Sequence, residues 1–171
     1  MTTLRPSHPT QSTSFTHDTP DELPAQIPDV RRFQSALAFP AALQALQPAR
    51  HELHKLLCDS GLARIADTVA LAAHELMANA VTHGCAGLPP DTTLGVTATC
   101  DGRRVQVRVQ DPSNGLPCVR PETNDQEGGR GMLLVEAFAD RWGVDKPPNG
   151  DAGKSVWMEL DLSPSECAEI S

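Results

Sequence analysis

The sequence has no excess of positive charge: 14 Lys and Arg residues stand against 22 Asp and Glu residues, for a net charge of −8. A protein that binds nucleic acid or an anionic membrane without specificity needs a basic face to neutralise phosphates. We therefore expect no direct nucleic-acid contact and no membrane contact. An anionic ligand would have to be held locally, by backbone N–H groups, a few cations or a metal ion.

Paired cysteines and long apolar runs are also absent. The five Cys are odd in number and none forms a C-x-x-C pair, which favours reduced thiols over a disulfide framework. No apolar run approaches the roughly 20 residues that a membrane-spanning helix needs. The first residues lack the apolar core of a secretory signal. These absences predict a cytoplasmic protein.

Two common site motifs are incomplete. The stretch 150–155 reads Gly-Asp-Ala-Gly-Lys-Ser, but a Walker A loop would need its first Gly where Pro148 stands, and a strand pattern follows instead of a helix. His74 and Glu75 begin the zinc-protease pattern H-E-x-x-H, but Ala78 occupies the position of the second His. The sequence thus excludes a P-loop and this zinc site.

Composition divides the chain into a folded domain and two tails. Residues 1–31 are rich in Pro, Ser and Thr and have almost no periodic apolar pattern. Such a segment cannot bury enough apolar surface to offset the entropy of ordering it. We predict a disordered N-terminal tail over 1–31, one domain over 32–163, and a short C-terminal tail over 164–171.

Apolar periodicity predicts an α+β domain. Alternation indicates strands over 33–39, 94–100, 105–109, 142–144 and 156–162, and helical spacing indicates helices over 48–60, 63–83 and 132–139. Asp101-Gly102 is a hairpin turn. Hairpin-joined strands mixed with helices favour a mostly antiparallel sheet with helices on one face. The loop over 112–131 is long, and loops of this length are usually functional.

The helix predicted over 63–83 carries a polar stripe beside its apolar face. The apolar positions fill an arc of roughly 140°, and Glu75, Asn79 and His83 follow one border at a spacing of four. One interpretation is a solvated edge with a hydrogen-bonding ladder. The other is a carboxylate, an amide and an imidazole that line a cleft. The helix by itself leaves both open.

Two glycine-bearing loops carry further candidates. Asp111 follows a Val-rich strand, and Gly115 comes four residues later. The Asp111 carboxylate could accept a hydrogen bond from an amino group of a ligand, while the backbone at Gly115 packs closely against that ligand. A plain turn would have the same residues. The run 128–131, Gly-Gly-Arg-Gly, precedes the helix predicted from Met132. Backbone N–H groups before a helix can bind an anion, although a structural hinge would look the same.

In order and spacing, these segments resemble the GHKL ATPases. The segment Glu75-x-x-x-Asn79-Ala80-x-x-His83-Gly84 is similar to the N-box, and Asp111-x-x-x-Gly115 to the G1 box. Gly129-Arg130-Gly131 is similar to the G2 box, and Gly153-Lys154-Ser155-Val156-Trp157 to the last box, on the final strand. The resemblance implies a Bergerat-type two-layer sandwich over about 32–162.

Within that superfamily, two runs resemble the anti-sigma-factor serine kinases of bacterial partner-switching systems. They are the stretches 128–135 and 140–144, which read Gly-Gly-Arg-Gly-Met-Leu-Leu-Val and Asp-Arg-Trp-Gly-Val. The implied function is a Mg²⁺–ATP-binding regulatory protein. It would phosphorylate a serine of a STAS-type anti-anti-sigma partner and bind a sigma factor.

The resemblance implies roles for the first two boxes. Asn79 would coordinate Mg²⁺, with phosphate oxygens and water completing the shell. Glu75 would be the general base that orients or deprotonates the attacking hydroxyl. Asp111 would accept a hydrogen bond from the adenine amino group, and Gly115 would allow close approach. His83 receives no chemical role.

The resemblance also implies an ATP lid and a binding role for Ser155 in the last box. Residues 122–131 would close on the phosphates, with Gly129 and Gly131 allowing the backbone to approach them. Arg130 would supply positive charge near the transferring phosphoryl group. Ser155 stands where the family often has Thr, a chemically equivalent hydroxyl.

Two other functions stay open at this point. One is a non-catalytic, nucleotide-dependent binding module; the complete set of box residues favours an active site over it. The other is the ATPase half of a sensor histidine kinase. Its phosphoacceptor helix is missing, since the faint match at 51–55 has Leu56 where a Pro is expected. A homodimer is common in the family, but no patch in the sequence establishes one.

Overall fold

The computed structural model describes residues 31–89, 91–113, 130–147 and 152–163. The predicted tails lie outside this part of the chain, apart from Arg31. Gly115, Gly129 and most of the predicted lid also lie outside it. No helix in the described part is long and apolar enough to cross a membrane.

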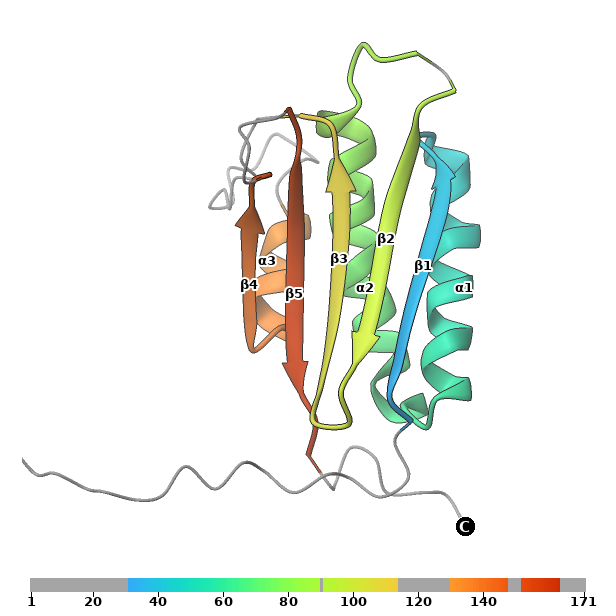
Figure 1. Ribbon diagram of the computed structural model, residues 1–171, viewed down its shortest axis with the longest axis vertical. Helices are drawn as coiled ribbons and strands as arrows, with labels where there is room; N and C mark the ends of the chain where they lie inside the picture. The colour runs from blue at the N-terminus through green and yellow to red at the C-terminus, as the bar shows by residue number, and fades with distance from the viewer. Residues whose placement is uncertain (1–30, 90, 114–129, 148–151, 164–171) are drawn as a thin grey trace, which may run out of the picture.

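The described strands form one five-stranded sheet in the order β1-β2-β3-β5-β4. Every neighbouring pair is antiparallel. Figure 1 shows the sheet with all helices behind it, so the predicted α+β sandwich with helices on one face is confirmed. The strands are β1 (Phe33–Pro40), β2 (Thr93–Cys100), β3 (Arg104–Asp111), β4 (Arg141–Asp145) and β5 (Lys154–Asp161).

Three α-helices cover the sheet in the described part of the chain: α1 (Leu46–Asp59), α2 (Ala63–Asn79) and α3 (Arg130–Phe138). A short 3₁₀ turn, η1 (Leu43–Ala45), precedes α1. The helix predicted over 63–83 is regular only to Asn79, after which the chain widens into a π-type segment, η2 (Ala80–Gly84). Segments of this kind occur frequently at functional sites.

The third helix begins earlier than its apolar pattern predicts. The prediction started it at Met132, but α3 starts at Arg130. Arg130 and Gly131 are therefore its first two residues and do not belong to a preceding loop. The difference arises because apolar periodicity begins only at Met132, whereas backbone geometry allows a Gly in a first turn.

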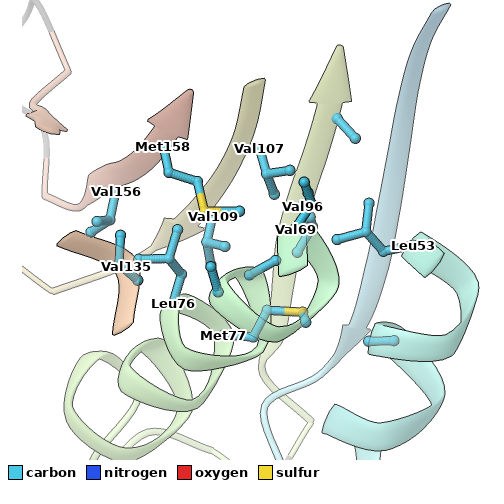
Figure 2. Close-up of a cluster of buried hydrophobic side chains, with 14 of the residues drawn as sticks. Leu53, Val69, Leu76, Met77, Val96, Val107, Val109, Val135, Val156 and Met158 are labelled. Atoms are coloured by element: carbon cyan, nitrogen blue, oxygen red, sulfur yellow. The ribbon is translucent and has the colours of Figure 1, made fainter. Parts of the chain in front are cut away.

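The core lies between the sheet and the helices. In β5, buried Val156, Met158 and Leu160 alternate with partly exposed residues, as the period of a half-buried strand requires. Figure 2 shows Val109 and Met158 of the sheet beside Leu76 of α2. Burying each such side chain contributes about 1.5–3 kcal/mol.

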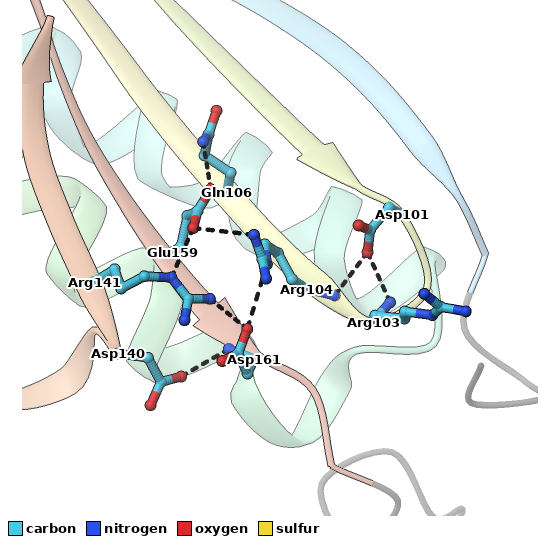
Figure 3. Close-up of polar contacts among 8 residues, drawn as sticks. All are labelled: Asp101, Arg103, Arg104, Gln106, Asp140, Arg141, Glu159 and Asp161. Carbon is cyan, nitrogen blue, oxygen red and sulfur yellow. Dashed lines mark hydrogen bonds and ion pairs between the residues drawn. The ribbon is translucent and has the colours of Figure 1, made fainter. Parts of the chain in front are cut away.

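The face of the sheet away from the helices carries an ion-pair network across β3, β5 and β4 (Figure 3). Arg141 Nε donates to Glu159 Oε2 at 3.0 Å, and Arg141 also pairs with Asp161. Arg104 approaches the same two carboxylates. Exposed pairs are individually weak, but this network supports the register of β4 on β5.

One end of the sheet collects the segments that carry the candidate residues. Because β3 and β5 are antiparallel, the last residue of β3 lies opposite the first residue of β5: Asp111 faces Lys154. The segment η2 contacts β3, and α2 packs against α3. Figure 1 shows the C-terminal end of α2 at this same end.

Candidate functional site

Asp111 is the centre of a buried polar cluster. Asp111 and Lys154 are each 7% exposed, and Lys154 Nζ donates to Asp111 Oδ1 at 2.9 Å. The backbone N–H and the hydroxyl of Ser113 donate to the same oxygen at 2.8 and 2.7 Å. Lys154 also donates to Ser113 Oγ. A buried ion pair needs such additional hydrogen bonds to offset its desolvation, and together they hold the Asp111 carboxylate in one orientation.

Two glycines allow backbone to pack against Asp111. A Cβ at Gly84 would lie 2.6 Å from Asp111 Cγ. Gly153 has φ +114°, where an L side chain is strained, and a Cβ there would lie 3.0 Å from the Asp111 carbonyl oxygen. Gly84 ends η2, so the segment that directly follows Asn79 is seated on the Asp111 side chain.

A third glycine joins Glu75 to α3. A Cβ at Gly131 would lie 2.5 Å from Glu75 Oε2 and 3.3 Å from Glu75 Cβ. The Glu75 carboxylate is half-buried and lies beside the first turn of α3. The N-box helix and the G2 segment, more than fifty residues apart in sequence, are therefore in direct contact.

Asn79 is the last residue of α2, one turn beyond Glu75, and is half-buried. His83 is exposed and lies in η2. Within the described residues no hydrogen bond links Glu75, Asn79 and His83, so the hydrogen-bonding ladder that the helical spacing allowed is not formed there. The widened turn after Asn79 moves His83 out of the stripe.

The sequence comparison agrees with this geometry. Residues 39–160 match a family model described as a histidine kinase-like ATPase domain. The chain belongs to the histidine kinase-like ATPase family. The match includes the N-box, Asp111, the start of α3 and the segment 153–157, so the GHKL resemblance is confirmed. A search of curated protein sequences gives no match.

A solved structure has the same fold as this ATPase domain. It is the crystal structure of the RsbU and RsbW domains of Rv1364c from Mycobacterium tuberculosis, with a TM-score of 0.54 and 18% sequence identity. The alignment covers 74% of this chain and 31% of that one. The chain therefore spans about a third of the length of the protein it resembles, and the likeness is one of fold.

In the ATPase domain the residue of the last box that reaches Asp111 is Lys154. The register places Ser155 opposite Gln110 and Asp145, on the open face of the sheet. Lys154 shares the helix-side face of β5 with buried Val156. Sequence reasoning missed Lys154, although extending the alternation of buried residues back from Val156 would have placed it on the helix-facing side of β5.

The amide oxygen of Asn79 could coordinate Mg²⁺ at a site where few other protein groups are ligands. Within the described residues no cluster of three or more His, Cys, Asp or Glu could hold a metal ion. Mg²⁺ in nucleotide sites is typically held by one or two protein oxygens, with substrate phosphates and water as the other ligands. The half-buried Asn79 amide, which the described residues leave without a hydrogen bond, fits such a role.

A cavity of about 560 Å³ adjoins the Asp111 cluster. Its volume is in the range of ligand pockets. Its lining comes from β3, β4, β5 and the residues next to them and does not include Glu75, so it borders the cluster at the end of the sheet. The residues that line it include Gln110, Asp111, Asp145, Gly153, Lys154 and Ser155.

Cys85 lies beside this cluster and is buried. Burial raises the pKa of its thiol, the negative charge of Asp111 raises it further, and Lys154 opposes them. The thiol is therefore held in its protonated, unreactive form. Cys58, Cys85 and Cys100 are free thiols among the described residues.

Proposed function

We propose that this domain binds ATP together with Mg²⁺ and transfers the γ-phosphoryl group to a serine of a partner protein. The observation that carries the proposal is the joining of three boxes at one end of the sheet. Gly84 of the N-box lies against Asp111, and Gly131 of the G2 box lies against Glu75. A base-binding carboxylate and a candidate general base are thereby connected through α2 and the segment η2 that follows it.

The base would bind at Asp111, which accepts a hydrogen bond from the adenine amino group. Gly115 would allow the base to approach closely. The phosphates would extend toward α3, where the backbone at Gly129 and Gly131 and the charge of Arg130 would neutralise them. A helix N-terminus with glycines is suited to this, because its N–H groups and dipole attract anions.

Asn79 would hold Mg²⁺, which when bound neutralises charge on the phosphate oxygens. Glu75 would take the proton from the partner's serine hydroxyl as its oxygen attacks the γ-phosphorus. The bond from the γ-phosphorus to the bridging oxygen breaks, and ADP leaves with that electron pair. Positive charge from Arg130 would stabilise the transferring group.

The partner is proposed to be a STAS-type anti-anti-sigma protein, and the domain is proposed to bind a sigma factor in the cytoplasm. Support comes from the likeness of 128–135 and 140–144 to the anti-sigma-factor serine kinases. The fold likeness to a structure that contains an RsbW domain agrees with it.

The test is incubation with radiolabelled ATP, Mg²⁺ and a panel of anti-anti-sigma domains, followed by identification of the labelled residue. Phosphoserine on one partner, lost in Glu75→Ala, is the expected result. Nucleotide binding without transfer to any partner would favour the non-catalytic binding module. The absence of any nucleotide binding at millimolar concentration would overturn the proposal.

A further inference from the structure

The hydrogen bonds to Asp111 are distributed unequally between its two oxygens. Oδ1 accepts from Lys154 Nζ, from the Ser113 backbone N–H and from the Ser113 hydroxyl. Among the described residues, Oδ2 accepts from none. The described residues therefore fix the carboxylate through Oδ1, and none of them occupies Oδ2.

Lys154 is placed to do more than neutralise this carboxylate. An ammonium has three N–H donors, and within the described residues two of them are used, on Asp111 Oδ1 and Ser113 Oγ. Lys154 is as deeply buried as Asp111 and lies on the same, helix-facing side of the sheet. An acceptor and a donor of opposite charge thus lie side by side, 2.9 Å apart.

We propose that Lys154 is a specificity-determining residue for the base: it donates to the N1 atom of adenine while Asp111 accepts from the neighbouring 6-amino group. This rests on the proposed function, since it needs the base to bind at Asp111. Adenine presents a donor and an acceptor next to each other on its Watson–Crick edge, which is the complement of Oδ2 beside Nζ.

The same pair disfavours guanine. In the adenine orientation, guanine would set its O6 acceptor against the Asp111 carboxylate and its N1–H donor against the Lys154 ammonium. Both contacts are repulsive and leave buried polar groups unpaired, which is how hydrogen-bonding sites reject the wrong ligand. Asp111 and Lys154 would therefore discriminate jointly, with each reading one atom of the base.

A purely structural Lys154 makes a different prediction. If Lys154 only neutralises Asp111, replacement of N1 in the base removes no contact with Lys154, and the affinity should not change. The wild-type protein can therefore decide the question with modified nucleotides, without any variant that is at risk of misfolding.

The experiment is calorimetric titration of the wild-type chain, with Mg²⁺, by ATP, by 1-deaza-ATP, in which a C–H replaces N1, and by purine riboside triphosphate, which lacks the 6-amino group. We expect each analogue to bind about ten-fold or more weakly than ATP, the scale of a lost hydrogen bond to a charged group. Equal affinity for ATP and 1-deaza-ATP would overturn the inference and leave the proposed function intact. No binding of ATP would overturn both.

Combining a Lys154 variant with the change at N1 completes a double-mutant cycle. In Lys154→Met, ATP should bind as weakly as 1-deaza-ATP, and the change at N1 should cost nothing further. Lys55→Met is the matched control, because Lys55 is an exposed residue of α1 that pairs with Asp59; it should keep the wild-type ratio of the two affinities. A ratio that stays at ten-fold in folded Lys154→Met would show that another group contacts N1.

Discussion

Glu75 and Gly131 lie in such close contact that a side chain on Gly131 would force the Glu75 carboxylate to move. A Cβ on Gly131 would fall 2.5 Å from Glu75 Oε2. The contact joins the C-terminal part of α2 to the first turn of α3, so the proposed general base and the proposed phosphate-binding segment are positioned by each other.

Gly131→Ala should separate catalysis from stability. The atom in the way is the end of a flexible side chain, so Glu75 can rotate aside at little cost to folding, and Ala favours a helix over Gly by about 1 kcal/mol. We expect a melting temperature near that of the wild type but a rate of phosphotransfer reduced about 100-fold, because the Glu75 carboxylate, the proposed general base, is displaced. Gly95→Ala, where a Cβ would lie 3.4 Å from Gln110 Oε1, is the control. Full activity in Gly131→Ala would show that Glu75 is not positioned by this contact.

Gly84→Ala should behave differently. Its Cβ would meet Asp111 Cγ at 2.6 Å and Cβ at 2.9 Å, and this side chain is held by several hydrogen bonds and cannot rotate away. We expect a loss of about 1–3 kcal/mol in the free energy of unfolding, the usual cost of overpacking, together with weaker ATP binding. Urea denaturation and calorimetry measure the two effects. Wild-type stability would mean that η2 can shift away from β3.

Glu75→Ala and Asn79→Ala should have different defects, the first in phosphotransfer and the second in Mg²⁺ binding. Glu75→Ala is expected to bind Mg²⁺–ATP normally while transfer to the partner serine falls roughly 100-fold or more. Asn79→Ala is expected to lose the part of nucleotide affinity that depends on Mg²⁺, and activity with it. Binding with and without Mg²⁺, followed by a transfer assay, distinguishes them. Identical behaviour in both assays would refute this division.

Asp111→Asn should weaken ATP binding by about 1–3 kcal/mol, since an amide donor can then face the adenine amino group, and should reduce discrimination against GTP. It should also destabilise the fold, because Lys154 is left as a buried charge without its partner. The double variant Asp111→Asn with Lys154→Met should recover stability but not affinity. Unchanged ATP affinity in folded Asp111→Asn would show that Asp111 has only a structural role in its turn and does not contact the adenine.

Acid should weaken the ion pairs on the open face of the sheet. Hydrogen bonds from Arg108 and from Arg141 lower the pKa values of Asp145 and Asp161 from 3.8. A lowered folded-state pKa means that the stabilisation is fully present above the unfolded value near 3.8 and is lost as pH falls through the folded value. Asp145→Asn with Asp161→Asn should therefore flatten the fall in melting temperature below about pH 4. An unchanged slope would show that these pairs add nothing.

Local patterns in the sequence were sufficient to predict the main strands and helices and their order along the chain. Alternating apolar residues predict a strand because each face of a sheet has one environment, so β2, β3 and β5 can be read directly. The spacing of Glu75 and Asn79 predicts their shared side of α2 for a similar reason, because one helical turn returns to the same side. The family resemblance also rests on such spacings.

Only the tertiary structure decided which distant residues meet. Lys154 reaches Asp111 across 43 residues because β5 pairs with β3 in one particular register, and a shift by one residue would have presented Ser155 instead. Gly131 meets Glu75 because α3 packs on α2. Local periodicity carries no information on either contact, since strand register and helix packing are set by how the whole core fills.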